Sequence, residues 1–280
     1  MICLTCDIHH MSLNTGNQLH TDRSEIKIAA DFMTILKRYN IKSTYFITGK
    51  SFEQEWPDLM PICSDDNIEI GGHNYNCFVP ELWHRGWNKL TGNYNGPRWQ
   101  QNWDIQKTKN LIFQKTGKMI TSWRNHMYMH GPNTEALLIN NGIDVCCDGV
   151  KRVSHGFEVH PTGLLNFPLN IIPDHEHLYH AERTPEWVDQ WIKRYNWSDD
   201  YGSQSYYIED WLNIVQNEIT LRESRGVISH LIIHPITLYL CDRYQSMTTL
   251  AEFISQYETI QVSELSNQYH QSLSPFSPRH

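Results

Sequence analysis

Short apolar runs alternate with longer amphipathic segments along the chain. In the segment 24–39 apolar residues recur with the period of one helix face, and Ser24 favours the N-cap position. The same pattern predicts further helices at 103–115, 134–140, from 184, at 208–223 and at 247–257. Apolar runs of strand length lie at 2–6, 43–47, 67–70, 120–123, 143–146, 164–169, 227–233 and 259–262.

The order of these elements predicts the fold class. Roughly seven strand–helix units follow one another without an internal repeat or linker, which favours an α/β fold with a parallel sheet. We expect this sheet to be closed or nearly closed into a single (β/α) barrel over residues 1–262. The Ser- and Pro-rich stretch 263–280 is expected to be a mobile C-terminal tail.

Composition narrows the class of function. The 280 residues carry 23 Lys and Arg against 31 Asp and Glu, a formal net charge of −8. This balance argues against nucleic acid as a partner, because binding to a phosphate backbone depends on clustered basic side chains. The longest apolar stretch, 231–240, is too short for a transmembrane helix. The seven Cys are an odd number and the first apolar run follows no basic segment, so we expect a cytoplasmic protein.

Sixteen His residues are the unusual feature of the composition. In parallel α/β folds the active site lies at the carboxyl ends of the strands. Several of the predicted strands end next to residues that can bind metal or transfer protons, so we expect these side chains to meet at one rim. They are Asp7, His9, His10, His73, Cys77, Arg124, Asp174, His175 and His234.

His73 and Cys77 are the first candidates for metal ligands. They are four residues apart, and on a helical turn this spacing places both side chains on one face. Imidazole and thiolate both bind zinc, and a catalytic zinc needs three protein ligands and one open position. His9 or His10 could supply the third ligand. The alternative is that Cys77 packs as a small apolar residue and His73 as a hydrogen-bonded core residue.

Two polar segments, 83–103 and 187–201, are rich in Trp and Tyr. Aromatic rings next to polar groups suit stacking against sugar rings. The alternative is that these rings anchor loops or form the contact of a homo-oligomer.

Five groups of residues, in order, resemble motifs of the NodB-homology polysaccharide deacetylases, which form carbohydrate esterase family 4, and especially their intracellular subgroup. The resemblance covers about 2–262. Residues 5–9 are similar to the motif T-F-D-x-D, and residues 69–77 are similar to the metal motif E-I-G-x-H-[ST]-x-x-H. The remaining segments resemble the F-R-x-P motif, the substrate side and the last histidine motif, and they are 122–124, 166–174 with 184–187, and 231–235.

The resemblance implies a metal-dependent amide hydrolase, and in the first place an N-deacetylase of a sugar or glycan precursor. Asp7 would be the general base, Arg124 would orient it, and His234 would be the general acid. One alternative is a cyclic-imide or allantoin-type C–N hydrolase. Another is a catalytically inactive relative that binds glycan or a protein partner.

The resemblance also implies a metal site, with zinc as the expected divalent cation. His9, His73 and Cys77 would be its ligands, although the family pattern has Asp in place of His9 and His in place of Cys77. A set of two imidazoles and a thiolate is softer than the family's set and still suits zinc. The residues expected to contact a carbohydrate or small amide substrate are His10, Asp174 and His175.

Overall fold

The computed structural model describes residues 1–273, which contain one eight-stranded sheet in the order β6-β7-β5-β4-β3-β2-β1-β8. Neighbouring strands run parallel except for β6 and β7, which are antiparallel. The strands are β1 (Ile2–Ile8), β2 (Ser43–Ile47), β3 (Ile68–Gly72), β4 (Ser122–Trp123), β5 (Val145–Cys146), β6 (Glu158–Val159), β7 (Leu165–Asn166) and β8 (Ser229–Ile233).

The gap between the two ends of the sheet is covered by the segment that follows β7. The backbone N–H groups of Asn170 and Ile171 both donate to the carbonyl oxygen of His230 in β8, at 3.2 and 3.3 Å. The predicted single, distorted (β/α) barrel is therefore confirmed, and it is nearly closed.

Thirteen α-helices lie within residues 1–273. α2 shows how the sequence pattern produces them: the Ser24 side chain accepts a hydrogen bond from the Lys27 N–H at 3.2 Å, and Phe32 and Leu36 are buried in the core. The helices are α1 (Gly16–Leu19), α2 (Glu25–Arg38), α3 (Gly49–Gln54), α4 (Trp56–Cys63), α5 (Glu81–Thr91), α6 (Arg98–Thr116), α7 (Thr134–Asn140), α8 (Asp174–His177), α9 (Pro185–Tyr195), α10 (Ile208–Glu223), α11 (Pro235–Asp242), α12 (Gln245–Ile254) and α13 (Val262–Leu273).

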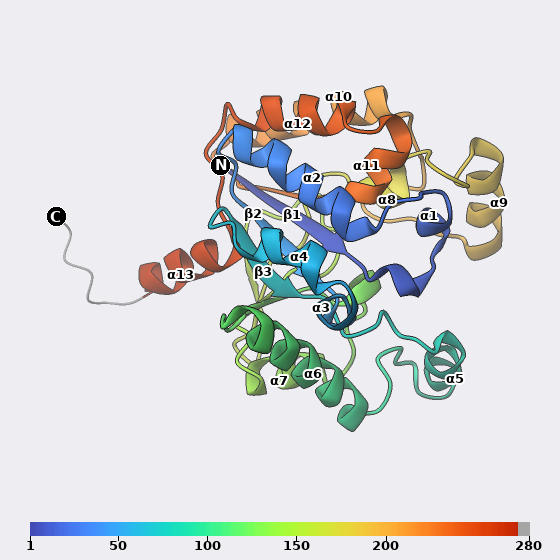
Figure 1. Ribbon diagram of the computed structural model, residues 1–280, viewed down its shortest axis with the longest axis vertical. Coiled ribbons are helices and arrows are strands. Elements are labelled where there is room, and N and C mark those ends of the chain that lie inside the picture. Colours follow the sequence, from blue (N-terminus) through green and yellow to red (C-terminus); the bar gives the residue numbers. More distant parts are fainter. Residues whose placement is uncertain (274–280) are drawn as a thin grey trace.

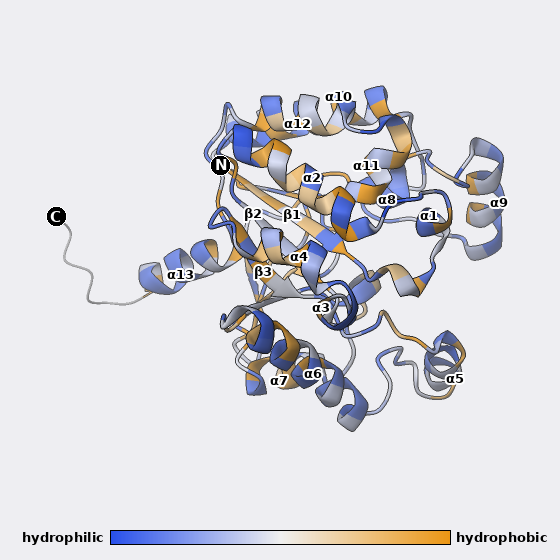
Figure 2. Ribbon diagram, viewed as in Figure 1, coloured by the Kyte–Doolittle hydropathy of each residue, from blue (hydrophilic) through white to orange (hydrophobic). Residues whose placement is uncertain are grey.

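The helices surround the sheet, and α2 and α6 pack into one hydrophobic cluster with the strands. In Figure 1, α2, α10, α11 and α12 lie towards the top of the view, and α6 and α7 lie at the bottom. α5 and α9 project at the end of the molecule towards which β1 points, whereas α13 lies at the opposite end. Figure 2 shows hydrophobic residues concentrated on β1 and on the helix faces turned towards it. None of the helices within residues 1–273 is long and apolar enough to cross a membrane.

Two glycines bring β3 close to its neighbours. A Cβ added to Gly71 would lie 2.5 Å from the Phe46 ring, and one added to Gly72 would lie 2.3 Å from the Trp123 ring. Both separations are shorter than real Cβ atoms show, so a side chain at either position would displace a buried aromatic ring. The carboxyl end of β3 therefore packs directly against Phe46 of β2 and Trp123 of β4.

The C-terminal part of the described chain differs from the sequence prediction. The expected strand 259–262 is reduced to one bridge between Ile2 and Thr259, because α13 begins at Val262. The first N–H groups of this helix donate to other side chains: that of Val262 to Thr44 Oγ1 and that of Ser263 to Glu69 Oε2, each at 3.0 Å. Residues 263–273 of the expected tail are thus an ordered helix, and residues 274–280 lie outside the described part.

Candidate active site

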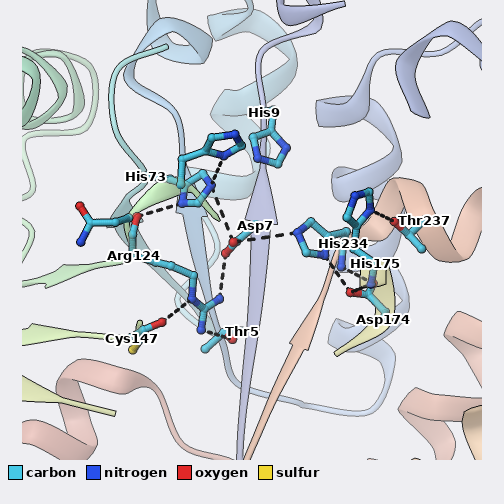
Figure 3. A network of polar contacts seen from close by, with 12 residues as sticks. Thr5, Asp7, His9, His73, Arg124, Cys147, Asp174, His175, His234 and Thr237 are labelled. Carbon is cyan, nitrogen blue, oxygen red and sulfur yellow. Dashed lines mark hydrogen bonds and ion pairs between the residues drawn. The ribbon is translucent and has the colours of Figure 1, made fainter. Parts of the chain in front are cut away.

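The side chain of Asp7, at the end of β1, lies at the centre of a buried polar network (Figure 3). Its Oδ1 accepts a hydrogen bond from Arg124 Nη1 at 2.8 Å. Arg124 is fully buried, and its other nitrogens donate to the Cys147 carbonyl oxygen at 2.8 Å and to Thr5 Oγ1 at 3.0 Å. Burial raises the pKa of Asp7, but the Arg124 guanidinium, together with His73 and His234, outweighs it and holds that pKa well below its usual range. Asp7 is therefore a carboxylate whose Oδ2 does not bond Arg124.

His234, directly after β8, faces this free oxygen. Its Nε2 lies 4.0 Å from Asp7 Oδ2, and its Nδ1–H donates to Asp174 Oδ1 at 2.7 Å. The backbone N–H groups of His234 and His175 also donate to the Asp174 carboxylate, at 2.6 and 2.8 Å. Burial lowers the pKa of His234, but the Asp174 carboxylate outweighs it and raises the pKa to about 9. At neutral pH His234 is an imidazolium that can donate a proton from Nε2.

His73 lies on the other side of Asp7 in Figure 3. Its Nδ1 donates to the Arg124 carbonyl oxygen at 2.9 Å, because a carbonyl can only accept. Its Nε2 therefore carries a lone pair, and this atom lies 3.7 Å from Asp7 Oδ2 and 3.3 Å from His126 Nδ1. Burial lowers the pKa of His73 to about 4, so the ring is neutral and available as a ligand.

His9 is oriented by a buried glutamate at the start of α2. Glu25 Oε1 accepts hydrogen bonds from both the backbone N–H and Nδ1 of His9, each at 2.9 Å. The Gln18 side chain donates to the other Glu25 oxygen at 2.9 Å. The His9 ring lies 5.1 Å from that of His73 and 5.2 Å from that of His126, measured between ring centroids. A carboxylate on one imidazole nitrogen leaves the other nitrogen for a metal, an arrangement common at metal centres.

Three side chains near Asp7 could hold a metal ion, because their ligand atoms lie within 4.8 Å of one another. They are His9, Cys77 and His126. This set fits a divalent cation of the zinc type, because two imidazoles and a thiolate can supply three ligands and leave a position open. Burial raises the pKa of the Cys77 thiol well above its usual value, so cation binding would have to displace that proton. His73 is outside this group of three, although its Nε2 adjoins His126.

The loop after β3 explains why Cys77 groups with His126. The sequence analysis placed His73 and Cys77 on a helical turn, but the chain leaves β3 at Gly72 without forming a helix. Asn74 and Cys77 both have a φ of 55°, in the left-handed region, which a right-handed helical turn does not contain. Asn74 Oδ1 accepts the backbone N–H of His126 at 2.8 Å, so the loops after β3 and β4 are joined.

The three residues expected to contact substrate occupy different places. Asp174 is fully buried behind His234 and orients it. The His175 ring lies 5.3 Å from that of His234, next to the network. His10 is turned away from this network, because its backbone N–H and its Nδ1 both contact Thr48 Oγ1 at 3.1 Å. His10 is completely buried, and its Nε2 has no hydrogen-bond partner within residues 1–273.

Two residues of the site were missed from the sequence. His126 follows Arg124 by two positions at the same strand end, and this spacing is the signal that could have indicated it. Glu25 gave no such signal, because an acidic residue in the first turn of a helix usually serves the helix dipole.

Residues 21–145 match the family model described as polysaccharide deacetylase. The match begins before α2 and ends at β5, so it includes His73, Cys77 and Arg124 but not Asp7 or His234. No curated protein sequence matches the chain significantly.

Solved structures show the same fold at low sequence identity. A Mycobacterium smegmatis protein assigned to the polysaccharide deacetylases has a TM-score of 0.68 and 13% identity, over 100% of this chain and 94% of that one. PuuE allantoinase has a TM-score of 0.62 and 13% identity, over 99% of this chain and 92% of that one. A Bacillus anthracis pseudoenzyme of carbohydrate esterase family 4 has a TM-score of 0.50 and 13% identity, over 95% of this chain and 65% of that one.

Proposed function

We propose that the chain is a metal-dependent N-deacetylase of a sugar or glycan precursor, because residues 21–145 match the polysaccharide deacetylase family model. One observation carries the proposal: the carboxylate of Asp7 and the imidazolium of His234 face each other in a buried site, with 4.0 Å between Oδ2 and Nε2. Amide hydrolysis needs a base for the attacking water and an acid for the leaving amine, and these two groups supply both.

Asp7 is suited to act as the base. Arg124 occupies its Oδ1, so the proton from water would go to Oδ2. The buried guanidinium keeps the carboxylate ionised at neutral pH, and its contacts to the Cys147 carbonyl and Thr5 fix its position. Arg124 therefore serves as a positioning residue for Asp7.

His234 is suited to act as the acid. The Asp174 carboxylate accepts its Nδ1–H and stabilises the protonated ring, which leaves Nε2–H as the proton for the amine nitrogen. Two hydrogen-bonded pairs, Arg124 with Asp7 and Asp174 with His234, thus face each other across 4.0 Å.

The metal would be held by His9, Cys77 and His126, with His73 next to them. When bound, a divalent cation of the zinc type supplies Lewis-acid polarisation of the amide carbonyl. Glu25 and Gln18 keep the His9 ring in place for this role. The thiolate among the ligands favours zinc over magnesium or calcium, which prefer oxygen ligands.

Aromatic residues near the barrel rim support a carbohydrate substrate. α5 and α9 both project at the end to which β1 points (Figure 1). In α9 the rings of Trp187 and Trp191 stack with centroids 6.0 Å apart, and the Arg183 guanidinium lies over both. In α5, Trp83 is 44% exposed. Exposed indole faces suit the apolar faces of sugar rings.

The proposal is tested by acetate release from N-acetylglucosamine oligomers, using the full chain loaded with zinc. We expect Asp7→Asn to lower kcat by about 10²–10⁴-fold, the usual contribution of a general base. Asp22→Asn, at an exposed position, is the matched control and should leave kcat unchanged.

Other outcomes would replace the proposal. Ring opening of allantoin without acetate release would favour the allantoin-type C–N hydrolase. Sugar binding that is insensitive to a chelator, without any hydrolysis, would favour an inactive relative. An unaltered rate in Asp7→Asn would remove Asp7 from the mechanism.

A further inference from the structure

A second group of histidine and carboxylate side chains lies among the short strands and shares no residue with the site around Asp7. His130 is in the loop after β4, Glu135 is in the first turn of α7, and His160 directly follows β6. These three side chains offer ligand atoms within 4.8 Å of one another. Glu135 Oε1 lies 3.1 Å from His160 Nδ1 and 3.7 Å from His130 Nε2, so one carboxylate oxygen faces both rings.

His130 is held from behind by another carboxylate. Its Nδ1 donates to Asp148 Oδ2 at 3.2 Å, which directs Nε2 towards Glu135. Asp148 is itself fixed, because it accepts hydrogen bonds from the backbone N–H and Nδ2 of Asn125 at 2.8 and 2.6 Å. Metal-binding histidines typically donate their second N–H to such a carboxylate.

The surroundings of the group favour a cation at these three residues. Cys146 is another possible ligand near His130. It is completely buried, however, and its thiol donates its proton to Asn166 at 3.3 Å, so the cation is placed at the other three residues. In the His160 ring the nitrogen that faces Glu135 is Nδ1, so this atom would be the ligand. The side chains of His130, Glu135 and His160 are 25–28% exposed, so a cation from solvent can reach them.

We propose that His130, Glu135 and His160 form a second divalent-cation site that takes zinc or a similar ion. Two imidazoles and one carboxylate are a common ligand set for zinc. The three ligands come from separate segments, so a bound cation would join the β6–β7 hairpin to the start of α7. Through Asp148 and Asn125 it would also steady the loop that leaves β4. This inference is independent of the proposed function, because it requires no catalysis and no residue of the first site.

The test is zinc content and zinc affinity of the full chain, measured by elemental analysis and calorimetry. A variant carrying Cys77→Ser and His126→Gln removes ligands of the first site and should still bind one zinc ion per chain. Adding Glu135→Gln and His160→Gln to that variant should abolish binding. Adding Glu158→Gln instead is the matched control, because Glu158 lies in the same hairpin and pairs with Lys151. The control should retain the zinc ion.

A second measurement covers any loss of folding. Zinc should raise the Tm of the Cys77→Ser, His126→Gln variant, and it should no longer do so when Glu135 is also replaced by Gln. If the first variant binds no zinc, or if Glu135→Gln and His160→Gln leave its zinc content unchanged, the second site is disproved. If the wild-type chain binds one zinc ion that only the Glu135 and His160 changes remove, the second site stands and the metal of the proposed function fails.

Discussion

The two halves of the sheet are stabilised in different ways. β8, β1, β2 and β3 have five to seven residues each, and their parallel ladders provide the hydrogen bonds. β4, β5, β6 and β7 have two residues each. In the long-strand half, the buried hydroxyls of Ser43 and Ser229 have no hydrogen-bond partner within residues 1–273. Other polar side chains add to these ladders: Thr5 Oγ1 donates to the Leu231 carbonyl oxygen at 3.0 Å, and Thr44 Oγ1 donates to Glu69 Oε2 at 2.8 Å.

In the short-strand half, side chains replace the backbone ladder. Asp148 accepts both nitrogens of Asn125, and the Asn166 amide bonds both the N–H and the carbonyl of Asp148. Asn170 accepts the His230 N–H at 2.8 Å and donates to the carbonyl of Ile228 at 2.9 Å. Long strands thus give a rigid frame, whereas buried amides and carboxylates position the irregular segments that carry Arg124 and His126.

The largest effect is expected where the two halves meet. Arg124→Met leaves Asp7 as a buried carboxylate without its cation, which should lower the free energy of unfolding at pH 7 by about 3–5 kcal/mol. In the wild type the depressed pKa of Asp7 gives stability that is lost as pH falls below its unfolded value. In the variant, burial favours the protonated acid. The difference between the two proteins in urea unfolding should therefore shrink below about pH 4.

The matched control for this change is Arg38→Met, because Arg38 is exposed at the end of α2. It should change the free energy of unfolding by less than about 0.5 kcal/mol. An equal decrease in the free energy of unfolding in both variants would mean that the Arg124–Asp7 ion pair does not stabilise the fold.

The next effect tests the polar network of the short strands. Asp148→Ala leaves two donors of Asn125 without an acceptor, at about 1–3 kcal/mol each. We expect urea unfolding to show a total loss of about 2–5 kcal/mol. Asp144→Ala, an exposed position next to β5, should have almost no effect. If the Asp148 variant is as stable as the wild type, side chains do not replace the ladder in this half.

A smaller effect concerns the pH profile. The pKa of about 9 at His234 predicts that kcat/KM falls above about pH 9, as the acid loses its proton. Asp174→Asn keeps an acceptor for Nδ1 but removes the charge, so the alkaline limb should move down by about one to three pH units. The same raised pKa gives stability that is complete below the unfolded value and is lost as pH rises through about 9. An unmoved limb in Asp174→Asn would assign it to another group.

The smallest effect is expected in the long-strand half. Ser43→Ala removes a buried hydroxyl without a partner, and its cost of burial disappears with it. Thermal unfolding should show a stability that is unchanged or higher by up to about 1 kcal/mol. A decrease in stability of more than about 1 kcal/mol would indicate that Ser43 makes a hydrogen bond. The long-strand half would then also depend on polar side chains.

The sequence predicted the long strands best, since apolar runs between polar segments carry a strong signal. The expected strand 43–47 coincides with β2. The runs at 120–123, 143–146 and 164–169 each contain a strand, but only two residues pair in each. β6 was not predicted, because Glu158 and Val159 are a polar and an exposed residue without an apolar pattern.

For the site, too, the sequence predicted the residues at strand ends and missed those that depend on loop conformation or tertiary packing. Asp7, Arg124 and His234 meet because parallel strands bring their carboxyl ends together, and this follows from the element order. The position of Cys77 depends instead on left-handed residues in the loop after β3, which a helical spacing cannot represent. Glu25 contacts His9 only because α2 packs against β1, so no local sequence pattern predicts this contact.

The two glycines of β3 also bear on how the protein could be engineered. The rings of Phe46 and Trp123 occupy the space that a side chain at Gly71 or Gly72 would need, so the end of β3 has no room for a new side chain. α5 and α9 project beside the barrel rim and have partly exposed aromatic side chains. Selection for a new substrate would therefore find viable variants in these two helices, while β3 would stay constant.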